Sequence, residues 1–223
     1  MKRRKSKERP ENLPSSGRIT KLSQVKRDPE RVSVYIDNIY VGTIYIDRLR
    51  ELKLQEGSIL EKELAERLYR QIDISLGLKL AMNKLSYRQR SIREIEIVLR
   101  RAWLSKEVVS EVIDFLMMRG YLNDSEFAKV VAQTYSKRKL PIGKRAIRSK
   151  MISKGIASEL IDEALEEIES DIELARKTAQ AGLKRYEKYD GYEKRKRLSV
   201  FLYQKGFSWD VIREVLDETI PED

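Results

Sequence analysis

The chain has 223 residues, of which 46 are Lys or Arg and 36 are Asp or Glu, so its formal net charge is +10. It contains neither cysteine nor histidine, which excludes disulfides, thiolate metal sites, cysteine nucleophiles and every mechanism that needs an imidazole base. A basic excess of this size favours a polyanionic partner, because each phosphate that Lys or Arg neutralises releases condensed counterions.

The first 16 residues are basic and almost free of apolar side chains. Six of the first nine are Lys or Arg, and such a segment cannot offset its ordering entropy, so we expect residues 1–16 to be a disordered basic tail. The tail could bind DNA or an acidic protein surface, or serve only solubility. No signal-peptide core follows it, and no stretch approaches the roughly 20 apolar residues of a membrane span. These features predict a soluble, cytoplasmic protein without a membrane partner.

A small β module is predicted next. Apolar and polar residues alternate in residues 31–36 and again in residues 39–46, and the intervening Asp37-Asn38 is typical of a hairpin turn. Because a lone hairpin is marginal in water, we expect it to recruit residues 19–25 as a third strand or to lean on the following helix. No strand is predicted after the hairpin.

The remaining apolar residues follow helical spacing. Leu60, Leu64, Leu68 and Ile72 lie four apart, and a series of shorter amphipathic stretches follows. A capping box marks the start of a helix: a polar side chain accepts a hydrogen bond from a backbone amide, and an acid three residues later bonds back to the amide of the first residue. These starts are predicted at Ser91/Glu94, Asn123/Glu126 and Ser170/Glu173.

The C-terminal half contains an internal repeat. The segment that begins at Lys154-Gly155-Ile156 matches, without a gap, the segment that begins 51 residues later at Lys205-Gly206-Phe207. A weaker copy begins at Arg101-Ala102-Trp103 and needs one extra residue. We expect Gly155 and Gly206 to end their helices in the left-handed conformation, which would strain Ala102.

Stacked repeats of this kind bury their apolar stripes against their neighbours. The predicted fold is therefore mainly α: an elongated array of three tandem three-helix repeats with a small N-terminal β-hairpin module. In chain order, we expect a tail at 1–16, the β module at 17–58, a connecting helix at 59–90 that leads into the first repeat, the rest of that repeat at 91–122, a second repeat at 123–170 and a third at 171–223.

Residues 119–128 (RGYLNDSEFA) closely resemble the GYLDD..FA segment that joins the first two repeats of RecX proteins. Together with the Lys-Gly-Ile and Lys-Gly-Phe helix ends, the resemblance covers residues 74–218. Residues 19–68 look like the β-containing N-terminal extension of longer members. The sequence departs from the family pattern at Ala102, where glycine is common, and at Asn123, where aspartate is common.

The resemblance implies a regulator of the RecA recombinase that is not an enzyme and needs no cofactor. RecX proteins bind the RecA–DNA filament in its groove and inhibit recombination, ATP hydrolysis and coprotease activity, in DNA repair and the SOS response. The implied partners are the RecA filament and the DNA phosphate backbone, and we expect a monomer. Since no nucleotide-binding loop occurs, any effect on ATP hydrolysis must act through a partner. The alternative is a stand-alone DNA-binding or architectural protein with helix-turn-helix-like surfaces.

Three clusters of basic residues are the candidate contacts to partner or DNA, whereas no catalytic or metal-binding residue is expected. The first two flank a loop at Pro141 and Gly143 that opens a helix, where backbone amides could also face phosphate. A basic run on a charged helical protein is as readily a solvated face. The candidates are Lys137, Arg138, Lys139, Lys144, Arg145, Arg148, Lys194, Arg195, Lys196 and Arg197.

Aromatic residues lie beside these clusters and near the repeat junctions. Tyrosines 186, 189 and 192 could stack on bases, but a role in covering a helix junction is favoured. Trp103, Phe207 and Trp209 are assigned to packing between helices rather than to ligand contact.

Two acidic patterns could in principle bind a metal. Residues 162–171 are interpreted as a solvated helix face, because a helix turns their carboxylates around its axis. Asp37 with Glu51 and Lys53 loosely resembles a metal-dependent nuclease, which needs carboxylates for a divalent ion. Since residues 48–54 look helical instead of extended, a nuclease is not expected.

Overall fold

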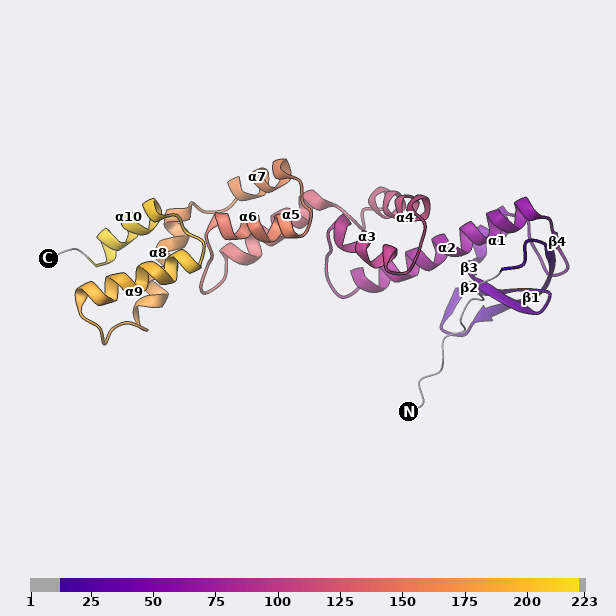
Figure 1. Cartoon of the computed structure of the whole chain (residues 1–223), viewed down its shortest axis with the longest axis horizontal. Helices are drawn as coiled ribbons and strands as arrows, with labels where there is room; N and C mark the ends of the chain where they lie inside the picture. The colour runs from indigo at the N-terminus through magenta and orange to yellow at the C-terminus, as the bar shows by residue number, and fades with distance from the viewer. Residues whose placement is uncertain (1–12, 221–223) are drawn as a thin grey trace. The chain divides into compact units, whose positions relative to one another are not determined.

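The computed structural model describes residues 13–220, which contain four strands and ten helices and are mainly α-helical (Figure 1). The chain divides into two compact units. The first extends to Arg88 and includes Ile95–Tyr121, and the second consists of Gln89–Glu94 and the residues from Leu122 onward. The elongated arrangement of the repeats stays a prediction, as do the predicted domain boundaries.

The predicted basic tail lies outside the described residues as far as residue 12. Leu13 packs against the core of the first unit, and the carbonyl of Pro14 accepts a 2.5 Å hydrogen bond from the Tyr69 hydroxyl. The prediction of disorder is therefore wrong for these two residues. A segment distant in sequence supplies the contacts that the tail itself lacks.

The sheet of the first unit is antiparallel, with the strand order β3-β2-β1-β4. Positive φ at Asp37 (46°) and Asn38 (66°) forms a two-residue turn that suits the right-handed twist of the strands, so the predicted hairpin is confirmed, as is its third strand. The short β4 pairs with the start of β1, so the prediction of no further strand is wrong; two residues are too few to show an alternating pattern. The strands are β1 (Gly17–Val25), β2 (Asp28–Ile36), β3 (Ile39–Tyr45) and β4 (Ile59–Leu60).

Three helices complete most of the first unit: α1 (Ile46–Glu51), α2 (Lys62–Leu85) and α4 (Lys106–Met118). Helix α2 packs on β3 and also on α4 (Figure 1). Leu68 of α2 is fully buried in one core with Val34 and Ile44 of the strands. Gly77 does not end α2; a Cβ at Gly77 would lie 2.9 Å from Val112, so the absent side chain permits the close approach of α4.

The other helices build the repeats. They are α3 (Ile92–Arg100), α5 (Asp124–Ser136), α6 (Lys144–Ser153), α7 (Ser158–Glu166), α8 (Asp171–Leu183), α9 (Gly191–Gln204) and α10 (Trp209–Thr219). Helices α5 to α7 enclose one core, which includes Phe127 and Ile161, and helices α8 to α10 enclose another, which includes Leu198 and Phe207. Within residues 13–220, every helix is too short or too polar to serve as a membrane span.

The helix ends confirm the predicted glycine role and correct the repeat alignment. Gly155 and Gly206 have φ of 78° and 91°. In the first copy, the left-handed residue at the helix end is Trp103, with φ of 59°. A buried apolar residue follows the left-handed residue in every copy: Leu104 after Trp103, Ile156 after Gly155 and Phe207 after Gly206. The copies therefore align without an extra residue, and the alignment on Ala102 is wrong.

The predicted helix starts are confirmed. Ser91 and Glu94 exchange two hydrogen bonds of 3.2 Å, each from the amide of one residue to the side chain of the other. The side chains of Asn123 and Ser170 accept hydrogen bonds from backbone amides in the first turns of α5 and α8. Reciprocal bonding of this kind satisfies amides that a helix start leaves without partners.

Equivalent contacts recur where consecutive repeats meet in the second unit. The amide of Ile92 donates to Asp124 over 2.9 Å, and the amide of Lys144 donates to Asp171 over 2.7 Å. In each pair, the first residue of one helix contacts the first residue of the first helix in the next repeat. These contacts fix the start of α6, which carries the second basic cluster.

Candidate nucleic-acid interface

The first basic cluster lies at the end of α5 and in the loop that follows. Lys137, Arg138 and Lys139 are exposed, and no carboxylate among residues 13–220 forms an ion pair with them. The Arg138 guanidinium lies 4.1 Å from the centroid of the Tyr135 ring, and the Lys150 ammonium lies 5.2 Å from the same centroid. Tyr135 thus brings a cation of the loop and a cation of α6 to one surface.

The second cluster occupies the start of α6. The amides of Gly143 and Lys144 donate to the carbonyl of Lys205 (3.0 Å) and the carboxylate of Asp171, so the prediction that this helix start presents its amides to phosphate is wrong for these two groups. Arg148 forms an ion pair with Asp162. The side chains of Lys144 and Arg145 have no carboxylate partner within the described residues.

The third cluster lies in the first half of α9. Arg195 donates to the carbonyl of Ile220 over 2.7 Å and pairs with Asp217, whereas Arg197 lies 2.8 Å from a Glu193 oxygen. Within residues 13–220, Lys194 and Lys196 form no ion pair.

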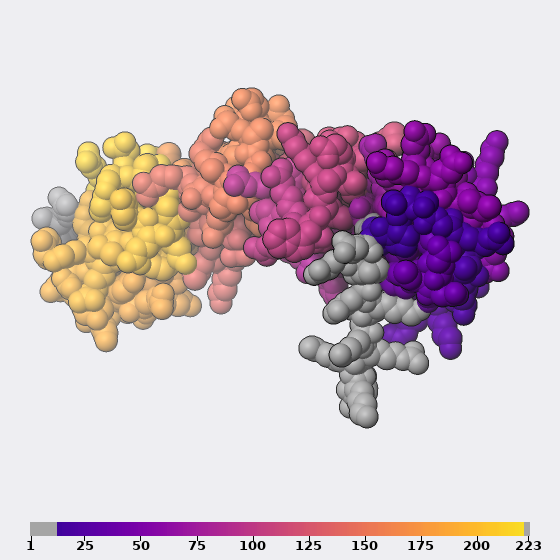
Figure 2. Space-filling model, turned by 45° about the vertical axis from the view of Figure 1, so that its right-hand side comes forward, coloured from indigo at the N-terminus to yellow at the C-terminus, as the bar shows by residue number. Residues whose placement is uncertain are grey.

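Seven of the ten candidates therefore lack an ion-pair partner in the described part of the chain. They are Lys137, Arg138, Lys139, Lys144, Arg145, Lys194 and Lys196. Arg148 and Arg197 form exposed ion pairs, which contribute only about 0 to 1 kcal/mol, so a phosphate can compete for these two guanidinium groups. The Arg195 side chain is only 17% exposed and also donates to the Ile220 carbonyl, so it is held in place more firmly. Figure 2 shows the second repeat, in rose to orange, beside the third repeat, in orange to yellow.

Repeat equivalence identifies one cation that the sequence reasoning missed. Lys154 lies 3.1 Å from a Glu94 oxygen, whereas its equivalent, Lys205, has no acidic partner within residues 13–220. The reason is that Ala146 stands at the position equivalent to Glu94. A correct alignment of the three copies would have revealed this loss.

The acidic stretch 162–171 is exposed over much of its length, but it is not simply solvated. Glu167 lies 2.6 Å from Lys129 of α5, Glu169 lies 2.5 Å from Lys177 of α8, and Asp162 pairs with Arg148. The hydrogen bond with Glu167 raises the pKa of Lys129 above its ordinary value. These carboxylates hold basic residues of neighbouring helices.

The residues of the nuclease hypothesis lie on separate elements. Asp37 accepts a 3.1 Å hydrogen bond from the Arg18 amide in the hairpin turn, whereas Glu51 ends α1 and pairs with Arg48 over 3.1 Å. Residues 48–51 are helical, as predicted. Across residues 13–220, no group of three or more acidic side chains is arranged to hold a metal ion.

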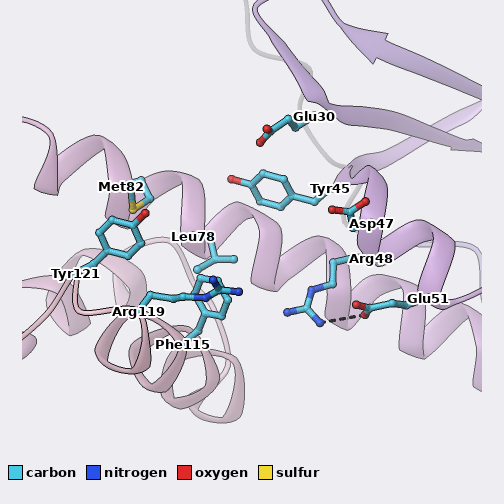
Figure 3. Close-up of a pocket in the computed structure, with 10 residues that line it drawn as sticks. All are labelled: Glu30, Tyr45, Asp47, Arg48, Glu51, Leu78, Met82, Phe115, Arg119 and Tyr121. Carbon is cyan, nitrogen blue, oxygen red and sulfur yellow. Dashed lines mark hydrogen bonds and ion pairs between the residues drawn. The ribbon is translucent and has the colours of Figure 1, made fainter.

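The first unit has a cavity of about 470 Å³ among α1, α2 and α4 (Figure 3). Figure 3 shows Tyr45, Arg48 and Arg119 among its lining residues, and the Arg119 guanidinium lies 5.4 Å from the Phe115 ring centroid. Burial raises the pKa of Tyr45 above its ordinary value. None of the ten candidate residues lines this cavity.

The predicted packing roles of the aromatic residues are partly confirmed. Tyr186 lies 6.4 Å from both Tyr189 and the buried Phe201, so it covers a helix junction, and Phe207 is fully buried. The packing role is wrong for Trp103, which is 95% exposed. Trp209 is 54% exposed and stacks on Tyr203 at the surface, so it does not fill a core.

Comparison with known proteins agrees with this architecture. The model of the regulatory protein RecX N-terminal domain matches residues 17–61, and the models of the second and third RecX three-helix domains match residues 123–165 and 169–216. The chain is 33% identical to the regulatory protein RecX of Bacillus licheniformis over 204 residues, which is 90% of this chain and 77% of that protein. It is also 33% identical to RecX of Bacillus subtilis over 203 residues, covering 90% and 76% of the two chains.

Two solved structures are similar. A crystal structure of regulatory protein RecX matches with a TM-score of 0.71 at 24% identity, over 90% of this chain and 98% of the other. RecX from Lactobacillus salivarius matches with a TM-score of 0.59 at 28% identity, over 66% and 96%. The fold, the family models and the relatives agree, and the chain belongs to the RecX family of regulatory proteins.

Proposed function

We propose that this protein regulates RecA without being an enzyme, by binding the RecA–DNA filament in its groove and inhibiting recombination, ATP hydrolysis and coprotease activity. Membership of the RecX family supports a regulatory role. The resemblance of the repeat junction to RecX proteins supports the filament as its target. In the proposed mechanism, Lys and Arg side chains contact the filament and its DNA, and no bond is made or broken by this chain.

The observation that carries the proposal is the set of seven candidate cations without an acidic partner in the described residues. They lie on two successive repeats, at the end of α5, the start of α6 and the first half of α9. Several cations on consecutive repeats can contact a periodic polyanion at several points. The more phosphates they neutralise, the more steeply the binding affinity falls as the salt concentration rises.

Charge reversal tests the site. The double variant Lys144→Glu/Arg145→Glu is expected to lose filament inhibition, measured as ATP hydrolysis by RecA on single-stranded DNA, while its helical content stays unchanged. Two reversed charges that replace phosphate contacts should weaken binding by at least tenfold at 0.1 M salt and reduce the salt slope. Lys62→Glu/Lys79→Glu is the matched control, because it makes the same change of net charge on exposed residues of α2.

Inhibition that is equal for both double variants would refute the site. The alternative function, a stand-alone DNA-binding or architectural protein, makes a different prediction: the protein would bind naked duplex as tightly as it binds RecA-coated DNA. A competition assay between these two forms of DNA therefore separates the two functions.

A further inference from the structure

An exposed aromatic pair lies where α9 ends and α10 begins. The rings of Tyr203 and Trp209 are stacked, with centroids 5.0 Å apart and planes 19° apart, and the Arg145 guanidinium lies 5.1 Å from the Tyr203 centroid. Trp209 is 54% exposed. Because Tyr203 covers one face of the indole, the exposure of Trp209 indicates that the opposite face is open to solvent.

Packing of the repeat does not require this pair. The residues equivalent to Tyr203 and Trp209 are Ile152 and Ser158 in the second copy and Arg100 and Lys106 in the first. All of these side chains are exposed. Both positions therefore face solvent in every copy, and only the third copy places aromatic rings there.

The two helix ends that meet beside the pair carry three cations. Lys144, Arg145 and Lys205 have no carboxylate partner among residues 13–220, and the hydrogen bond from the Gly143 amide to the Lys205 carbonyl places the start of α6 beside the end of α9. Two carboxylates also belong to this region: Asp171 accepts the Lys144 amide, and Asp210 follows Trp209 in the sequence. An open aromatic face beside a cationic rim is the combination that binds single-stranded nucleic acid.

We propose that the open face of Trp209 stacks on one base of single-stranded DNA while Lys144, Arg145 and Lys205 contact the adjacent phosphates. Tyr203 supports the indole from behind and Arg145 supports Tyr203. Single strands are preferred, because the internal bases of a duplex have both faces covered by neighbouring base pairs. This site rests on the proposed function only in taking DNA as a ligand.

The two tryptophans allow a direct test. Trp103→Phe leaves Trp209 as the single indole, and Trp209→Phe leaves only Trp103, which is 95% exposed and lies in the first unit. A single-stranded 20-mer of thymidine is expected to quench the emission of Trp209 and not that of Trp103, and inorganic polyphosphate is expected to quench neither. In an anisotropy titration with the same 20-mer, Trp209→Leu should lose about 5- to 150-fold in affinity, the range for one stacked base, and Trp209→Phe should keep most of it.

Several results would overturn the inference. Binding of the 20-mer without quenching of Trp209, or equal quenching by a 20-bp duplex, would show that the indole does not stack on a base; failure to bind the 20-mer at all would do the same. Weaker binding of Trp209→Leu to the RecA filament with unchanged affinity for the 20-mer would assign Trp209 to a protein contact. The proposed function is tested separately, by whether the native protein inhibits RecA. Inhibition would leave the proposed function standing in each of these cases, and its absence would refute the proposed function itself.

Discussion

Replacement of Gly206 by alanine should destabilise the third repeat more than the same change at Gly120 destabilises its own surroundings. Both glycines have positive φ, 91° and 72°, so alanine costs about 1 to 2 kcal/mol at either position. An added Cβ at Gly120 meets no atom within 4 Å, whereas at Gly206 it would lie 2.4 Å from the Ala146 Cβ and 3.1 Å from the Ala146 amide nitrogen. Because the α6 backbone must then move, overpacking adds about 1 to 3 kcal/mol at Gly206 alone.

Urea unfolding followed by tryptophan emission measures this difference. In a Trp103→Phe background, Trp209 reports the third repeat and hence Gly206→Ala; in a Trp209→Phe background, Trp103 reports the first unit and hence Gly120→Ala. The loss of unfolding free energy should be larger for Gly206→Ala by about 1 to 3 kcal/mol. Equal losses would contradict the close contact between α6 and the end of α9, and with it the position of Arg145 beside Tyr203.

Two further predictions concern polar contacts in the second unit. Asp171→Ala should lower the free energy of unfolding by about 1 kcal/mol, because the Lys144 amide loses its acceptor; Asp171→Asn, which keeps an acceptor oxygen, is the control in the same urea titration. Two hydrogen bonds of 2.7 Å from Arg176 hold the pKa of Glu218 below its ordinary value of 4.5. A carboxyl whose pKa is lower in the folded state stabilises the fold above its unfolded pKa and loses this contribution as the pH falls through the folded pKa. Glu218→Gln should therefore lower the urea midpoint at pH 7 and have a smaller effect at pH 3; an effect of the same size at both would show that the pair is not linked to titration.

Local patterns predicted much of the fold. The turn at Asp37-Asn38, the capping box of Ser91 and the helix end at Gly155 each depend on a backbone conformation within a few residues, and residue type strongly restricts that conformation. Strand β4 was missed because two residues carry no periodicity and become a strand only by pairing with β1. The misplaced helix end of the first copy has a different cause. A tryptophan rarely adopts a positive φ, so the sequence alignment placed the helix end at Ala102, one residue before Trp103.

The candidate site was predictable as a set of basic residues but not in its pairing. The clusters at 137–139 and 144–145 stand out as sequence runs. Helix packing decides which of these cations meets an acid. It brings Asp162 to Arg148 and Asp217 to Arg195, whereas it brings no acid of the described residues to Lys205. The sequence pattern does not predict the exposure of Trp209 either, because an apolar residue near a repeat junction is usually buried.

Residue types and near neighbours were enough to predict the repeat, the hairpin turn, the capped helix starts and the excess of positive charge, because each of these properties is local. Which charges are paired, and which aromatic rings are exposed, follows instead from contacts between distant helices. Asp162 and Arg148 are 14 positions apart, Asp171 and the Lys144 amide are 27 apart, and Arg145 and Tyr203 come from different repeats. Such contacts are set by how whole helices pack, and no short stretch of sequence encodes them.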